Sequence, residues 1–117
     1  AALKASRPHL PVIGFPRGAG RMPLDYVQNT QIGALSIDPQ IAPKWAATVF
    51  QPLVPVQGNL DPACLLAGGL AMEAAAEDIL VHLSRGAFIF NLGHGVIKET
   101  PPEHVKELVG LVRAWQA

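Results

Sequence analysis

One histidine between two glycines is the feature of this sequence that most clearly suggests chemistry. His94 lies in the segment FNLGHG, residues 90–95, directly after a run of apolar residues. Glycine lacks a Cβ atom, so a ligand can approach the backbone closely on either side of the imidazole. The imidazole can donate a hydrogen bond or a proton near physiological pH. It could instead hold its own loop by bonding a neighbouring carbonyl, and the residues alone leave both interpretations open.

Polar residues also follow the other apolar runs of the chain. Arg17 opens the turn Arg-Gly-Ala-Gly, which could cradle an anion, but the turn lacks the dinucleotide fingerprint and the Walker lysine. A tight turn with a solvated or ion-paired arginine is the simpler explanation. Asp38 precedes a proline and either orders its loop or faces a site. Gln57 and Asn59 flank Gly58 and either satisfy turn backbone or present amides to a ligand.

The elements that must position these residues repeat along the chain. Short apolar runs at residues 12–15, 34–37, 53–56 and 87–90 alternate with stretches of helical pattern. Nearly continuous apolar character is typical of parallel strands covered on both faces. The repetition predicts an α/β fold of about four βα units, either half of a (β/α)8 TIM-type barrel or an open doubly wound sheet. In a barrel, the residues just after the strands meet at one rim, where active sites lie.

Two helices have clear start signals. Asp61-Pro62 predicts an N-cap and a first helical residue, and the helix should run to about Ser84. Within it, Gly68-Gly69 should cause either a bend or close packing against the sheet. The pattern Thr100-Pro101-Pro102-Glu103 predicts a capping box for the last helix. The buried stripe predicted for that helix is Val105, Leu108, Val109, Val112 and Trp115.

Composition limits the possible functions further. The chain has 117 residues, half of them hydrophobic, which fits one compact unit over residues 1–117 without a domain boundary. Nine basic residues balance nine acidic ones, so no global basic field favours nucleic acid. No apolar run approaches the roughly 20 residues of a membrane span. The single cysteine, Cys64, predicts a reducing compartment, hence the cytoplasm, and no His or Cys pair has metal-ligand spacing. The chain, which starts without Met, looks cut from something longer.

Three segments in series resemble the uroporphyrinogen decarboxylase family. They are residues 12–20 (VIGFPRGAG), 57–62 (QGNLDP) and 90–95 (FNLGHG), followed by residues 100–103 (TPPE). Their order and spacing match the C-terminal third of the family's sequence, from about Leu3 to the end of the chain. The resemblance implies the C-terminal half of a TIM-type barrel, from a cytoplasmic, homodimeric enzyme of porphyrin and haem biosynthesis. Such an enzyme decarboxylates the four acetate side chains of uroporphyrinogen III to give coproporphyrinogen III, without a metal or an organic cofactor.

The resemblance also implies roles for individual residues. His94 matches the family histidine that contacts the substrate, and Arg17 is kept as a further candidate. Other recurrent positions at the mouth of the barrel are expected to shape loops or support the contacting groups, and they are matched by Asp38, Gln57, Asn59 and Asn91. The family's remaining contacts, which include an arginine-rich loop, an aspartate and a tyrosine, would belong to the missing N-terminal half of the barrel. The isolated chain is therefore predicted to be inactive and, through its open edges, to self-associate.

Two other functions remain as alternatives. A non-catalytic half barrel could serve as an assembly module that docks through its open edges, but its strand-end polar residues would then be arbitrary, and the intact segment around His94 speaks against this. Zinc- or corrinoid-dependent methyltransferases of the same superfamily hold zinc through Cys and His. Cys64 lies in a predicted helix without a His-x-Cys partner, which argues against that function.

Overall fold

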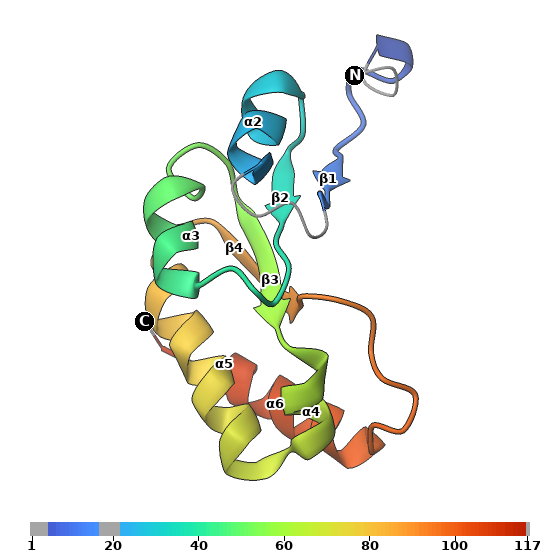
Figure 1. The fold of residues 1–117 in the computed structure, drawn as a ribbon, viewed down its shortest axis with the longest axis vertical. Helices are drawn as coiled ribbons and strands as arrows, with labels where there is room; N and C mark the ends of the chain where they lie inside the picture. Colours follow the sequence, from blue (N-terminus) through green and yellow to red (C-terminus); the bar gives the residue numbers. More distant parts are fainter. Residues whose placement is uncertain (1–4, 17–21, 117) are drawn as a thin grey trace.

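The strands of this chain form one parallel sheet. The computed structural model describes residues 5–16 and 22–116, and Figure 1 shows their arrangement. Within these residues the sheet has four strands in the order of the sequence, namely β1 (Ile13–Gly14), β2 (Ala34–Ser36), β3 (Val56–Leu60) and β4 (Phe88–Leu92). Every neighbouring pair is parallel, and helices connect the strands. The helices are α2 (Met22–Asn29), α3 (Pro43–Val49), α4 (Pro62–Ala67), α5 (Gly69–Leu83) and α6 (Pro102–Ala114). The predicted α/β fold of four βα units, half of a TIM-type barrel, is confirmed.

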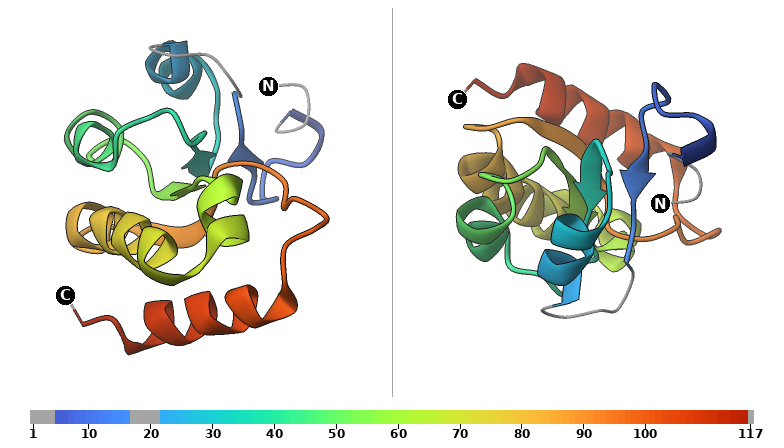
Figure 2. Two further views of the ribbon diagram at one scale, coloured as in Figure 1. Left: turned by 60° about the horizontal axis from the view of Figure 1, so that its bottom comes forward. Right: turned by 90° about the horizontal axis from the view of Figure 1, so that it is seen from above.

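In the described part of the chain, α2, α3, α5 and α6 cover one face of the sheet. Seen from the end, α2, α3, α5 and α6 form an arc outside the strands (Figure 2). The core between the arc and the sheet includes Leu35, Ile37, Phe50, Val56, Leu60, Met72 and Leu83. On the opposite face, Ile13, Phe15 and Ile89 are 49%, 40% and 46% exposed. The expectation of strands covered on both faces therefore holds for β2 and for most of β3, whose residues are buried. It is wrong for the edge strands β1 and β4, where the open face is the one that a closed barrel turns inward.

Strand β3 begins later than the apolar run predicts. The predicted strand at residues 53–56 is wrong, because the backbone N–H groups of Leu53 and Val54 donate to the carbonyl of Phe50 at 2.9 and 3.1 Å. These bonds keep the chain in a turn after α3. Pairing with β2 and β4 starts at Val56; it ends at Gln57 on the β2 side and continues through a polar stretch to Leu60 on the β4 side. The last strand is likewise displaced, to Phe88–Leu92 instead of residues 87–90.

The long helix predicted from Asp61 to Ser84 is broken at Gly68. Asp61 does cap α4, since its side chain accepts a hydrogen bond from the N–H of Ala63 at 2.9 Å. Gly68 then has φ +65°, a conformation that favours glycine, and α5 starts in a new direction. A Cβ atom on Gly68 would lie 2.6 Å from the His104 ring. The glycines therefore give both a bend and close packing, but the packing partner is α6 and not the sheet.

Helix α6 differs from its prediction at its start and along its stripe. Its N-cap is Pro101, without a side-chain cap bond, so Thr100 does not form the predicted capping box. Of the predicted stripe, Leu108 is buried, whereas Val105 and Val109 are 42% and 41% exposed. The two valines line an apolar groove between α6 and β4 of about 400 Å³. None of the helices in the described part of the chain has the length and apolar character of a membrane span.

Candidate active site

A cleft opens on the uncovered face of the sheet, toward the carboxyl ends of the strands. Its volume is about 400 Å³, and residues from all four βα units line it. We call it the strand-end cleft, and its lining consists of Ile13, Phe15, Ser36, Gln57, Asn91, Leu92, Gly93, His94 and Gly95. Of the candidates from the sequence, the cleft brings together Gln57, Asn91 and His94. Arg17 lies outside the described residues.

His94 stands two residues beyond the end of β4, at the rim of the cleft. Its side chain is exposed and makes no hydrogen bond with another described residue. Gly93 fixes the backbone beside it, since its N–H donates to the carbonyl of Leu60 at 2.8 Å. A Cβ atom on Gly93 would lie 2.6 Å from the backbone nitrogen of Pro39. Only glycine lets the loop lie this close to the turn after β2, so this contact helps to set the position of His94.

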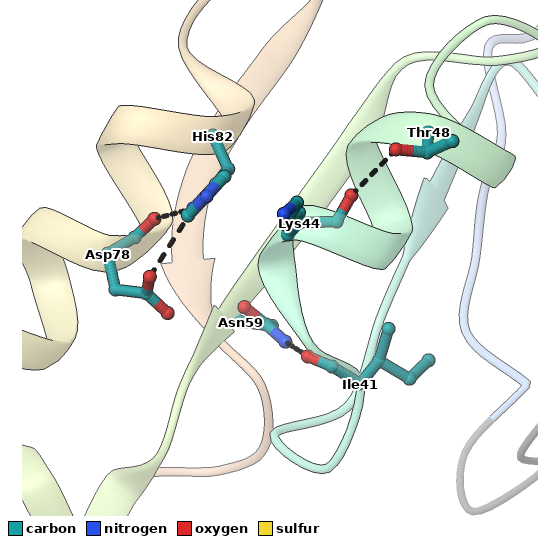
Figure 3. Close-up of polar contacts among 6 residues, drawn as sticks. All are labelled: Ile41, Lys44, Thr48, Asn59, Asp78 and His82. Carbon is teal, nitrogen blue, oxygen red and sulfur yellow. Dashed lines mark hydrogen bonds and ion pairs between the residues drawn. The ribbon is translucent and has the colours of Figure 1, made fainter.

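Asp38 and Asn59 hold the turn against which Gly93 packs. Both are buried, with 7% and 3% of their surface exposed. The Asn59 side-chain N–H₂ donates to the carbonyls of Asp38 at 3.0 Å and Ile41 at 2.6 Å, and Figure 3 shows Asn59 directed from β3 toward Ile41. The Asp38 carboxylate in turn accepts a hydrogen bond from the N–H of Gln40 at 2.9 Å. Neither residue lines the strand-end cleft, so each acts on it through the loop backbone.

The backbone conformation of Gly58 explains why the side chain of Asn59 does not lie on the cleft face of the sheet. Along a regular strand side chains alternate between faces, so Asn59 would follow Gln57 into the cleft. Instead Gly58 has φ +143°, and Asn59 borders a cavity of about 130 Å³ on the helix side. A Cβ atom at Gly58 would lie 2.9 Å from the carbonyl oxygen of Ile37. Glycine is therefore required at this position both for its backbone conformation and for space.

Ser36 is a cleft residue that the sequence did not single out. It is 8% exposed, and its hydroxyl accepts a hydrogen bond from the side-chain N–H₂ of Gln57 at 3.3 Å. The sequence did carry a signal, namely a hydroxyl residue inside an otherwise apolar strand. A buried strand does not need a hydroxyl group for its packing. On the other side of the cleft, the side-chain oxygen of Asn91 accepts a hydrogen bond from the N–H of Leu92 at 2.8 Å.

Besides His94, the polar side chains that line the cleft are the uncharged Ser36, Gln57 and Asn91. No Asp or Glu is among the described residues that line it. Over residues 5–16 and 22–116, no group of three His, Cys, Asp or Glu side chains is placed to hold a metal ion. Cys64 lies on α4, away from the cleft, where burial and, second, the nearby Asp61 carboxylate raise the pKa of its thiol. The cleft therefore suits binding, orientation and proton delivery.

Comparison with known proteins identifies the family. Residues 1–115 match the uroporphyrinogen decarboxylase (URO-D) family. The chain is 48% identical over 113 residues to a protein of Rhodospirillum rubrum named uroporphyrinogen decarboxylase, covering 97% of this chain and 32% of the relative. Proteins of the same name from Sphingopyxis alaskensis and Erythrobacter litoralis are 46% and 49% identical, over 95% and 97% of this chain and 32% and 33% of their own lengths. The chain thus spans about a third of these relatives, their C-terminal third, and it belongs to the uroporphyrinogen decarboxylase family.

Proposed function

We propose that this chain forms the C-terminal part of a uroporphyrinogen decarboxylase. The complete enzyme would convert uroporphyrinogen III to coproporphyrinogen III by decarboxylating its four acetate side chains, a step of haem biosynthesis. The observation that carries this proposal is the convergence of His94, Asn91 and Gln57 on one cleft at the strand ends of a barrel fold. Membership of the family supplies the substrate class.

The chemistry of the substrate suits a cleft lined by one histidine and uncharged polar side chains. A proton added to an electron-rich pyrrole carbon makes the ring cationic, and the ring then accepts the electron pair released when the bond to the carboxyl group breaks. Carbon dioxide leaves, and protonation of the remaining methylene carbon with loss of the first proton completes a methyl group. The net change at each acetate is uptake of one proton and loss of one CO₂. Because the ring is its own electron sink, the proposal needs no metal and no organic cofactor.

His94 is the residue proposed to contact the substrate. Its imidazole is exposed at the rim and free of bonds to the described residues, so both ring nitrogens remain available to a bound group. Histidine can donate a hydrogen bond to a carboxylate or a proton to carbon near neutral pH. Asp38 and Asn59 would support this contact through the turn that holds Gly93, and Ser36 would orient the amide of Gln57.

The rest of the enzyme is needed for activity in this proposal. Uroporphyrinogen carries up to eight carboxylates, whereas the chain has no net charge. The N-terminal part of the barrel would supply the other contacts and would pair with the open edges of β1 and β4. We therefore propose that the isolated chain, as a single unit over residues 1–117, is inactive. The complete protein would be a cytoplasmic homodimer.

A hybrid enzyme tests the proposal. This chain would replace the C-terminal third of the Rhodospirillum rubrum relative, with the unaltered relative as the positive control. Purified hybrid would be mixed anaerobically with uroporphyrinogen, and coproporphyrinogen would be quantified by chromatography. We expect turnover by the hybrid and none by the isolated chain. A hybrid that folds and dimerises but forms no coproporphyrinogen would overturn the proposed function, and turnover by the isolated chain would overturn its predicted inactivity.

A further inference from the structure

We infer that the side-chain amide of Asn91 is a direct substrate contact that donates hydrogen bonds to a carboxylate of the bound porphyrinogen. This inference rests on the proposed function and deepens it. The sequence assigns Asn91 only a supporting place at the mouth of the barrel. In the structure, by contrast, Asn91 itself lines the strand-end cleft and is exposed.

Strand alternation places Asn91 on the cleft face. Along β4 the side chains of Phe88, Phe90 and Leu92 are half-buried and pack against the core, whereas Ile89 and Asn91 are exposed. Ile89 pairs in register with Gln57, another cleft residue. Successive residues of a strand point to opposite faces, so Asn91 shares the open face with its neighbours Ile89 and Gln57.

The hydrogen bond that Asn91 makes fixes the orientation of its amide. The N–H of Leu92 can only donate, so the group that it meets at 2.8 Å is the side-chain oxygen of Asn91. The N–H₂ group is the part of the amide that is left for other partners. It has no hydrogen-bond partner among the described residues, whereas the N–H₂ of Gln57 is already bonded to Ser36. Asn91 therefore presents two free donors at the wall of the cleft.

A carboxylate is the group that such donors fit. No Asp or Glu lines the described part of the cleft, so an anion there meets no fixed negative charge. Hydrogen bonds to an ionised acceptor are shorter and stronger than those between neutral groups. The proposed substrate carries carboxylates on all of its side chains. Both acetate and propionate groups offer this chemistry, and the experiment below separates them.

The substitution Asn91→Asp in the hybrid enzyme tests the inference. An aspartate of nearly the same shape still accepts the Leu92 N–H bond, but it replaces the two donors with a negative charge. We expect the KM for uroporphyrinogen to rise at least about tenfold, because a bond to a charged group is lost and a repulsion is gained. The unfolding midpoint should stay unchanged. Gln28→Glu, which adds the same charge on the exposed surface of α2, should leave KM unchanged.

A second measurement keeps binding separate from turnover and identifies the carboxylate. The dissociation constants of uroporphyrinogen and of coproporphyrinogen, which retains only the propionates, would be measured from the fluorescence quenching on rapid mixing, before uroporphyrinogen is decarboxylated, with the hybrid and with its Asn91→Asp variant. Weakened binding of both ligands supports the inference with a propionate, and weakened binding of uroporphyrinogen alone supports it with an acetate. Unchanged dissociation constants for both ligands would overturn the inference and leave the proposed function standing, since that function is judged by turnover of the unsubstituted hybrid.

Discussion

Asn59 and Asn91 are the same residue type, paired in register on neighbouring strands, yet their surroundings are opposite. Asn59 lies next to the last residue of β3, on the helix side of the sheet, 3% exposed, with its N–H₂ shared between two backbone carbonyls. Asn91 lies on β4 facing the cleft, exposed, with its N–H₂ free of the described residues. The conformation of Gly58, with φ +143°, separates the two cases.

This difference divides the polar residues at the strand ends into two groups. The first group, Asp38 just after β2 and Asn59 near the end of β3, satisfies the turn that follows β2 and does not itself line the cleft. The contact between Gly93 and Pro39 links this turn to the cleft. The second group, at the end of β4, leaves donors open to a ligand. Substitutions in the first group should therefore change stability first, and substitutions in the second should change substrate handling first.

The largest effect is expected for Asn59→Asp. The new carboxylate would be buried facing the carbonyl oxygens of Asp38 and Ile41, which lose their donor. Leaving an unpaired charge and unsatisfied carbonyls in the interior should lower the free energy of unfolding of the hybrid by about 3 to 5 kcal/mol. Urea denaturation would measure this. Asn91→Asp is the matched control, with an expected loss below about 0.5 kcal/mol at an exposed site. Equal losses of unfolding free energy in the two variants would contradict the claim that Asn59 stabilises the fold and Asn91 does not.

A smaller effect, on activity alone, is expected for His94→Asn. Loss of the imidazole should lower kcat/KM for uroporphyrinogen about 100-fold, which corresponds to about 2.7 kcal/mol. The unfolding midpoint should be unchanged because the side chain is exposed and unbonded to the described residues. His9→Asn, at another exposed histidine, serves as the control in the same assay. Wild-type kcat/KM in the His94 variant would mean that His94 does not contact the substrate.

The substitution Gly93→Ala should lower both stability and activity, because Gly93 lies where the two groups of residues meet. Its Cβ atom would lie 2.6 Å from the backbone nitrogen of Pro39, and neither backbone can yield without moving the loop. We expect a loss of about 2 kcal/mol of stability, as for other overpacked sites, together with lower kcat/KM because His94 is displaced. Gly110→Ala, whose Cβ atom meets nothing within 4 Å in α6, should be neutral or stabilising. If Gly93→Ala behaves like Gly110→Ala, the turn after β2 does not position the histidine.

The smallest effect concerns a cysteine outside both groups. Burial and the Asp61 carboxylate raise the pKa of the Cys64 thiol, so less thiolate is present at a given pH and alkylation by iodoacetamide should be slower than for free cysteine. Asp61→Asn removes the negative charge but keeps an N-cap acceptor, so the pKa should fall and alkylation at pH 8 should speed up. Peptide mass spectrometry would follow the reaction. Glu73→Gln is the control, and an unchanged rate in Asp61→Asn would leave burial as the sole cause.

The sequence predicted the repeating βα order because apolar runs and helix start signals are local. It misplaced β3, since the actual strand carries Gln57, Gly58 and Asn59 in place of an apolar run. The side chain of Asn59 is satisfied there by bonds to a distant turn, which no local pattern predicts. The stripe of α6 was predicted as buried from its spacing alone. Val105 and Val109 instead line an open groove in this chain, and periodicity does not reveal whether a partner surface is present.

For the candidate site, the sequence singled out the loop of His94 through its glycines, and the structure places Gln57 and Asn91 with His94 along one cleft. It did not distinguish Asn59 from Asn91, because strand alternation predicts the same face for both until Gly58 departs from the regular conformation. Ser36 was missed because a single hydroxyl in an apolar strand is usually structural. Its relation to Gln57 depends on the register between β2 and β3, which no local pattern specifies.

A crystal structure of the hybrid with coproporphyrinogen or its oxidised porphyrin bound would test the central claim most directly. We predict a ligand in the strand-end cleft, with a ligand group in contact with His94 and a carboxylate within hydrogen-bond distance of the Asn91 N–H₂. Asn59 should keep its bonds to Asp38 and Ile41 without touching the ligand. A ligand bound elsewhere, or one held by Asn59 while the end of β4 stays free, would contradict the account.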